Sequence, residues 1–363
     1  MNSANVYIVE TPLQLLNAIE ARHFFNFRNN QLIIRVGGTG FPQMMLKSMV
    51  DDNHWDRVTY FSFNNKDIQF KSNLLGGKCS NLINGYMYDY QQYTNRRMIN
   101  NLSYSVGKID NIFLGNYLFG KQLYMRHFAN TSEHKTTYLL DDGTDVLLIN
   151  NYRARKSRES ESDLNISKQS GLKWILRNIL FDWDNTEADS VIFFSAYDID
   201  VGNNDKLIRN EYKYIRSNIE KGTTNDCVYF LGQCMVQDNC MKEEVYFEYL
   251  KKVCMYFHDK TIYYIPHPRE SENIIRRISE SIGMKVRKFD VPIEYAMSIK
   301  GNTPGILASF FCSALQNCKI IYGNSIVIKY IFIKQEHMSV YNELARNTYK
   351  YYSKNTSIEV VMP

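Results

Sequence analysis

The sequence contains no Cys-x-x-Cys pair and no cysteine cluster with metal-ligand spacing. Its 7 cysteines form an odd and scattered set, which is typical of reduced thiols in a cytosolic protein. No stretch approaches the ~18 uncharged apolar residues of a membrane-spanning helix. Internal repeats and low-complexity tracts are absent as well. These absences speak against a disulfide scaffold, a cysteine-based metal site and a membrane span.

Two further absences concern location and charge. The N-terminus, "MNSANVYIVETPLQ", has no basic segment followed by a long apolar run, so we expect no signal peptide and a cytoplasmic protein. The formal net charge of +5 comes without the clustered basic stripes of nucleic-acid-binding proteins, so no nucleic-acid partner is expected. A modest positive charge fits an anionic small ligand or an anionic membrane surface.

Short apolar strands alternate with helix-length segments along the 363 residues. This alternation predicts α/β structure with mostly parallel sheets. The strands are expected at 6–9, 31–40, 58–63, 111–116 and 136–143, and then at 227–233, 262–268, 285–290, 305–310 and 319–328. Helices in the second half are expected near 243–257, 272–282 and 293–298.

The polar segment 198–225 is expected to connect two domains. We place the boundary so that an N-terminal domain covers 1–205 and a C-terminal domain covers 206–363. Chains of this length can bury two separate cores. Two α/β halves in tandem form a cleft, which is a usual place for a ligand.

The stretch "YLLDDGTD" at 138–145 has two interpretations. Asp-Gly is a strong hairpin-turn signal, and "TDVLLINNY" could supply the second strand. Alternatively, Asp141 and Asp142 present a catalytic carboxylate at the end of a buried strand, followed by Gly143. The residues alone leave both interpretations open.

An early helix start is indicated by Thr11-Pro12-Leu13-Gln14, directly after the first strand. Thr11 is placed as an N-cap, with proline at the first helical position and Gln14 completing a capping box. Both side chains could equally line the cleft on the acceptor side, so the structural and the binding interpretation stay open.

Four short motifs of the second half follow predicted strands, where open α/β sheets bind ligands. Gly232 and Gln233 allow close backbone approach to a flat ligand. His267 stands on a loop stiffened by flanking prolines, Pro266 and Pro268. Glu294 lies in the first turn of a predicted helix, where its carboxylate could accept hydrogen bonds from ribose hydroxyls. The segment from Ser309 to Ser313 offers hydroxyls and backbone N–H groups suited to a phosphate.

The acidic pair with glycine, the His-Pro motif and the serine-rich loop, in this order, resemble those of bacterial sialyltransferases. The opening "YIVETPLQLLNAIEA" is most similar to glycosyltransferase family 52, which includes lipooligosaccharide sialyltransferases. The resemblance covers both halves of the chain. It implies a GT-B architecture, with two Rossmann-like domains facing a central cleft. It also implies a CMP-sialic acid donor bound mainly by the C-terminal domain, and a glycan acceptor.

When the family's residue roles are transferred to the matching positions, the resemblance implies that Asp142 is the general base. Asp141 is the second choice, and Gly143 would lie beside the substrate. His267, with Pro268, would contact the CMP phosphate and assist its departure. The serine motif departs from the family pattern because "FFC" separates its hydroxyls, so Ser309 and Ser313 both remain phosphate ligands to be considered. Glu294 would hold the ribose, and Gly232 and Gln233 the cytosine side.

The expected reaction is an inverting, metal-independent transfer to a hydroxyl, for example of a galactoside in lipooligosaccharide or a capsule precursor. The alternatives are a transferase for another CMP-activated nonulosonic acid or Kdo, and a non-catalytic glycan-binding or assembly protein. Acceptor, linkage and oligomeric state, including a homodimer, are left open.

Two motifs compete with this interpretation. Asp182-Trp183-Asp184 and Asp198-Ile199-Asp200 match an Asp-x-Asp metal pattern, but lack the further ligands that divalent cations prefer. Gly37-Gly38-Thr39-Gly40 lacks the spacing of a nucleotide-binding loop, and a tight turn is expected instead. The polar segment 151–168 is expected to be a surface loop leading into an apolar helix at 174–181. The lesser interpretation of that helix is a peripheral contact with the inner face of the membrane.

Overall fold

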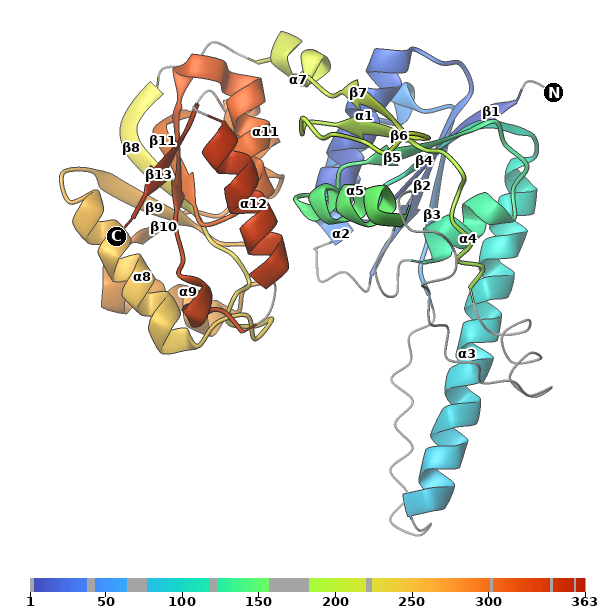
Figure 1. Ribbon diagram of the computed structural model, residues 1–363, viewed down its shortest axis with the longest axis horizontal. Coiled ribbons are helices and arrows are strands. Elements are labelled where there is room, and N and C mark those ends of the chain that lie inside the picture. The colour runs from blue at the N-terminus through green and yellow to red at the C-terminus, as the bar shows by residue number, and fades with distance from the viewer. Residues whose placement is uncertain are drawn as a thin grey trace.

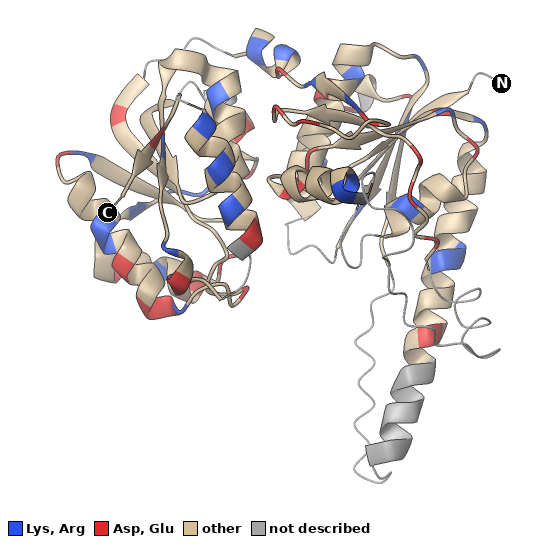
Figure 2. Cartoon of the chain, viewed as in Figure 1, with Lys and Arg blue, Asp and Glu red and all other residues tan. Residues whose placement is uncertain are grey.

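The computed structural model describes residues 3–37, 43–63, 77–117, 123–156, 183–219, 224–300, 303–339, 342–355 and 357–362. Within them the chain forms two α/β domains that lie side by side (Figure 1). Most of the charged residues lie on helices and loops rather than on strands, which leaves the sheets apolar (Figure 2). No helix in these ranges is long and apolar enough to cross a membrane.

The first domain contains seven parallel strands in the order β3-β2-β1-β4-β5-β6-β7. All six residues of β1 are buried, as expected for an interior strand of a sheet covered on both faces. The strands are β1 (Ala4–Val9), β2 (Asn30–Arg35), β3 (Arg57–Phe61), β4 (Ile109–Leu114), β5 (Thr136–Leu140), β6 (Ile192–Ser195) and β7 (Lys206–Arg209). The helices are α1 (Pro12–Phe25), α2 (Gln43–Met49), α3 (Gly77–Val106), α4 (Tyr124–Asn130), α5 (Asp145–Lys156) and α7 (Lys213–Ser217).

The second domain contains six parallel strands in the order β10-β9-β8-β11-β12-β13. The strands are β8 (Thr224–Leu231), β9 (Thr261–Ile265), β10 (Lys285–Val286), β11 (Thr303–Ser309), β12 (Val327–Ile331) and β13 (Ile358–Val361). The helices are α8 (Glu243–Tyr256), α9 (Glu272–Arg277) continued by a short π-helix at Ile278–Ile282, α10 (Ile293–Lys300), α11 (Ser313–Tyr322) and α12 (Asn342–Lys354).

The two domains meet along α12, which packs against α5, and along α11, which packs against α7 (Figure 1). The backbone N–H of Asp198 donates to the hydroxyl of Tyr351 at 3.0 Å. The side chain of Gln316 donates to the carbonyl of Ala196 at 3.2 Å. These contacts join the segment after β6 to α12 and to α11, the helix that begins with Ser313.

The predicted parallel α/β class is confirmed, but several boundaries are wrong. β7 pairs with β6 in the first sheet, so the predicted boundary at 205 falls just before the last strand of that sheet, and the second sheet begins with β8. The predicted strand 319–328 begins as helix, because Lys319–Tyr322 end α11 and bury Ile321 beside Cys318 on one helix face. Only the first two residues of the predicted strand 285–290 form β10.

Some predictions fall on residues that the structure does not describe. They are Gly38, Thr39 and Gly40 of the glycine-rich loop, the predicted surface helix 174–181, and the loop from 157 onward. Gly37 is described and has a positive φ of 79°, as a tight turn requires. The predicted loop starts too early, since α5 continues to Lys156.

Candidate active site

A cleft of about 670 Å³ lies between the two domains. Its walls come from residues that follow β1 and β5 in the first domain, and β8, β9 and β11 in the second. Nine predicted site residues line it: Thr11, Asp142, Gly143, Gly232, Gln233, His267, Pro268, Glu294 and Ser313. The other three, Gln14, Asp141 and Ser309, are buried behind the walls.

Asp142 is held at the end of β5 by side chains from neighbouring strand ends. Asn116 Nδ2 donates to Asp142 Oδ2 at 2.9 Å, and Thr11 Oγ1 donates to Oδ1 at 3.4 Å. Burial raises the pKa of Asp142, and the polar groups of Asn116, Gln14 and Thr11 offset part of that rise. A fixed carboxylate of raised pKa is suited to accept a proton from a hydroxyl. Because α5 follows directly, the hairpin interpretation of Asp-Gly is wrong.

A further carboxylate lies beside Asp142. Asp145, in the first turn of α5, also lines the cleft. Burial, and then the charge of Asp142, raise the pKa of Asp145 to about 7. Two carboxyls that share a site do not ionise independently, so the pair retains a proton more readily than either alone. No sequence motif singles out Asp145; its place three residues after Asp142, at a helix start, was the available signal.

Asp141 supports the site from inside the protein. Its Oδ2 accepts a hydrogen bond from the backbone N–H of Ala196 at 2.7 Å, and its carbonyl accepts one from Asn17 Nδ2 at 3.0 Å. Burial raises the pKa of Asp141 to about 7, although Ser195, Ala196 and Arg209 oppose the rise. Asp141 therefore ties the end of β5 to the end of β6 and does not face the cleft.

The predicted helix start at Thr11 is confirmed, with one difference in its capping. Thr11 Oγ1 accepts from the backbone N–H of Gln14 at 3.2 Å. Gln14 Oε1, however, accepts from the backbone N–H of Glu10 at 2.8 Å, one residue earlier than a capping box requires. A Cβ at Gly115 would overlap the Gln14 side chain, so this packing needs glycine there. Thr11 both caps α1 and contacts Asp142, whereas Gln14 is buried support.

The first domain also contributes a buried ion pair. Arg35, at the end of β2, lines the cleft, and its Nη1 lies 2.8 Å from Glu10 Oε2. Tyr124 donates to the same carboxylate oxygen at 3.1 Å. The guanidinium also lies 4.6 Å from the ring centre of Phe63. Arg35 thus places a fixed guanidinium in the first domain's wall of the cleft, which the charged residue ending the apolar run "QLIIR" could have indicated.

The His-Pro loop after β9 is fixed by a buried carboxylate. Glu270 accepts from the backbone N–H of His267 and from the hydroxyl of Tyr264, each at 2.6 Å. Burial raises the pKa of Glu270 to about 7. Burial and the nearby Arg269 lower the pKa of His267 to about 4, so the imidazole is neutral at pH 7 without an anion beside it. Pro268 follows it in the cleft wall.

Gly232 and Gln233 connect the loops after β8, β9 and β11. A Cβ at Gly232 would overlap the Tyr264 hydroxyl and Glu270, so no other residue fits against that pair. The side-chain oxygen of Gln233 accepts from the backbone N–H of Phe311 at 3.3 Å. The glycine therefore serves close packing between loops.

The structure separates the two candidate serines. Ser309, at the end of β11, donates its hydroxyl to the carbonyl of Leu231 at 2.8 Å and is fully buried. Ser313 opens α11 and lines the cleft. Cys312, the N-cap of α11, makes no side-chain hydrogen bond to the helix start. The first turn of α11 therefore offers Ser313 and backbone N–H groups to an anion.

Glu294 lies in the first turn of α10, as predicted, and lines the cleft next to Pro292 and Ile293. Its Oε1 accepts from Asn317 Nδ2 at 2.9 Å. Burial raises the pKa of this carboxyl. Asn317, on α11, thus fixes Glu294 relative to the helix that carries Ser313.

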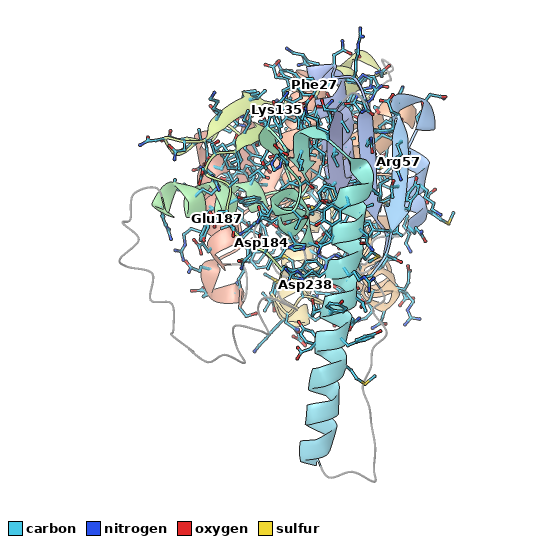
Figure 3. All side chains as sticks on the ribbon, turned by 90° about the vertical axis from the view of Figure 1, so that its right-hand side faces the viewer. Phe27, Arg57, Lys135, Asp184, Glu187 and Asp238 are labelled. Atoms are coloured by element: carbon cyan, nitrogen blue, oxygen red, sulfur yellow. The ribbon has the colours of Figure 1, made fainter. Side chains whose placement is uncertain are left out.

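The Asp-x-Asp motifs do not assemble a metal site in the described part of the chain, where no group of three or more His, Cys, Asp or Glu could hold an ion. Asp184 lies near Glu187 in the segment before β6 (Figure 3) and does not line the cleft. Its motif partner Asp182 is not among the described residues. Asp198 and Asp200 are exposed.

No protein-family model matches the sequence, and no curated protein matches it either. Similar solved structures cover almost the whole chain. The Methanocaldococcus jannaschii UDP-GlcNAc 2-epimerase, in complex with UDP-GlcNAc and UDP, has a TM-score of 0.52 and 10% identity over 99% of this chain and 89% of that chain. Arabidopsis thaliana UGT89C1 complexed with UDP has a TM-score of 0.46 and 8% identity over 100% and 87%.

Identities this low show the fold alone. Together with the two parallel sheets and the cleft between them, the likeness to the epimerase confirms the predicted GT-B architecture of two Rossmann-like domains facing a central cleft.

Proposed function

We propose that the chain is an inverting sialyltransferase, which moves sialic acid from CMP-sialic acid to a hydroxyl, such as that of a galactoside in a surface glycan. The observation that carries the proposal is the meeting of two loops across the cleft. A Cβ at Gly143 would lie 3.3 Å from Ser313 Oγ. The carboxylate of Asp142 and the anion-binding start of α11 therefore face one shared space.

Each wall supplies one half of the chemistry. Asp142 accepts the proton of the acceptor hydroxyl as its oxygen attacks the anomeric carbon. On the other wall, His267, Ser313 and the first N–H groups of α11 stabilise the negative charge that develops on the departing CMP phosphate. Attack from one face and departure from the other give inversion, and no covalent enzyme intermediate is required.

The choice of donor rests on the resemblance of Asp142-Gly143, His267-Pro268 and the serine loop to the sialyltransferase motifs. Glu294 is proposed to hold the ribose, and the Gly232-Gln233 loop the cytosine side. Another CMP-activated nonulosonic acid or Kdo would use the same groups. We propose a reaction without a metal ion, in the cytoplasm or at the inner face of the membrane.

Thermal melting tests the donor class. CMP is expected to raise the melting temperature, whereas UDP and GDP at equal concentration are not. Stabilisation by UDP alone would contradict a CMP-linked donor. Turnover of CMP-sialic acid that persists in EDTA supports the metal-independent reaction, and its loss would overturn that part of the proposal.

A further inference from the structure

Two groups converge on one nitrogen of His267. The backbone N–H of Arg269 donates to His267 Nδ1 at 3.2 Å. The Sγ atom of Cys234 lies 3.1 Å from the same Nδ1. Cys234 is buried and lines the cleft directly after Gln233. The contact therefore links the loop after β8 to the His-Pro loop after β9.

The N–H of Arg269 decides where the ring proton lies. A donor directed at Nδ1 requires a lone pair on that nitrogen, so a neutral imidazole carries its proton on Nε2. Because Nδ1 then has no proton to give, the Cys234 thiol is the donor in the sulfur contact, and the two donors share the one lone pair of Nδ1.

The alternative is a thiolate paired with an imidazolium, as in cysteine nucleophiles. In that state Nδ1 would carry a proton that faces the N–H of Arg269, so two donors would point at each other with no acceptor between them. Burial also disfavours both charges, because it raises the pKa of Cys234 to about 12 and lowers that of His267 to about 4. The carboxylate of Glu270 accepts from the backbone N–H of His267 rather than from its ring. The neutral pair is therefore the favoured state.

We propose that Cys234 is a positioning residue: its thiol, together with the backbone N–H of Arg269, holds His267 as the tautomer that carries the proton on Nε2. Under the proposed function, a leaving phosphate would accept a hydrogen bond from that N–H. The effect on transfer rests on the proposed function, whereas the assignment of the proton to Nε2 does not depend on it.

The test uses the full chain with ¹⁵N-labelled histidine, and Cys234→Ala, Cys234→Ser and the control Cys254→Ala, whose thiol lies on α8 outside the cleft. The His267 signals are assigned by their loss in His267→Asn. Wild type is expected to show an unprotonated Nδ1. Cys234→Ala should raise the pKa of His267 and lower kcat about three- to tenfold, the effect of losing one hydrogen bond. Cys234→Ser, which keeps a donor, and Cys254→Ala should stay near wild type.

A protonated Nδ1 in folded wild type overturns the proposal without any variant. An unchanged pKa and kcat in folded Cys234→Ala overturns it too. If the nitrogen signals and the pKa shift are as expected but wild type transfers no sugar from CMP-sialic acid, the positioning role of Cys234 stands and the proposed function fails.

Discussion

Gly143 and Ser313 approach each other across the domain boundary, with 3.3 Å between the Cβ position of the first and the hydroxyl oxygen of the second. Gly143 has a φ of +69°, which favours glycine on conformational grounds as well. The contact fixes how near the carboxylate loop comes to the start of α11. Reactants bound in the cleft beside this contact would have little freedom to separate, which is how an enzyme lowers the entropic part of a barrier.

Gly143→Ala is therefore expected to lower kcat/KM about 10- to 100-fold, because its methyl group pushes Ser313 and α11 away from the base. Gly107→Ala is the matched control. Gly107 has a similar φ of +81°, and among the described residues nothing lies within 4 Å of its Cβ position. Both variants should lose about 1 kcal/mol of unfolding free energy from backbone strain. Equal kcat/KM in the two would show that the cleft contact has no importance.

Alanine variants of the two serines should have different effects, one on CMP binding and the other on the free energy of unfolding. Ser313→Ala is expected to weaken CMP binding by about 10- to 100-fold, the effect of losing a hydrogen bond to a charged group. Ser309→Ala removes the buried hydroxyl that donates to the Leu231 carbonyl and should cost about 1–3 kcal/mol of unfolding free energy, with CMP affinity nearly unchanged. Calorimetric titration with CMP and thermal melting measure the two effects, and a reversed pattern would assign the phosphate to Ser309.

The pH dependence of transfer should depend on Asp145. Burial raises the pKa of Asp142, and its coupling to Asp145 favours protonation of the pair. Since the base must be unprotonated, kcat should rise with pH along its acid limb. Asp145→Asn removes the neighbouring negative charge, so the pKa of Asp142 falls and the limb moves to lower pH. A pH–rate profile that does not move would show that the two carboxyls act independently.

Asp141 should affect stability rather than transfer. Burial raises its pKa from 3.8 to about 7 in the folded state, so the folded protein binds a proton that the unfolded chain has lost. Unfolding free energy should therefore decrease as pH rises from about 4 to 7, by at most about 1.4 kcal/mol per pH unit. Asp141→Asn should flatten this slope in denaturant titrations while retaining transfer. Loss of transfer in folded Asp141→Asn would restore it as a catalytic candidate.

The sequence predicted best what local chemistry determines. Pro12 after Thr11 marked the start of α1, and apolar runs ending in glycine or proline marked the carboxyl ends of β8 and β9. The prediction failed where one sequence pattern is compatible with both a strand and a helix. The run at 319–322 is apolar enough for a strand, but packing on one face of α11 makes it helical. The strands β6 and β7 were missed because each has only four residues.

The sequence predicted which segments form the candidate site, but not which of their side chains face the cleft. Asp141 and Asp142 are chemically identical in sequence, and only the alternation of side chains at the end of β5 sends one inward to Ala196 and the other to the cleft. Ser309 and Ser313 differ because the first ends β11 in the interior and the second begins α11 at the cleft. Arg35 was missed because its importance comes from Glu10, which is distant in the chain. Asp145 was missed because it belongs to no known motif, although it lies only three residues after Asp142.

The most direct test of the account compares the rate of sialic acid transfer by wild type with the rate for Asp142→Asn. The measurement is release of CMP and formation of sialylated product from CMP-sialic acid and a panel of galactosides, with CMP affinity determined on the same preparation. We predict that wild type transfers, and that the variant binds CMP as tightly but transfers about 10²- to 10⁴-fold more slowly, the usual contribution of a general base. Transfer by Asp142→Asn at the wild-type rate, or no transfer by wild type to any galactoside, would contradict the account.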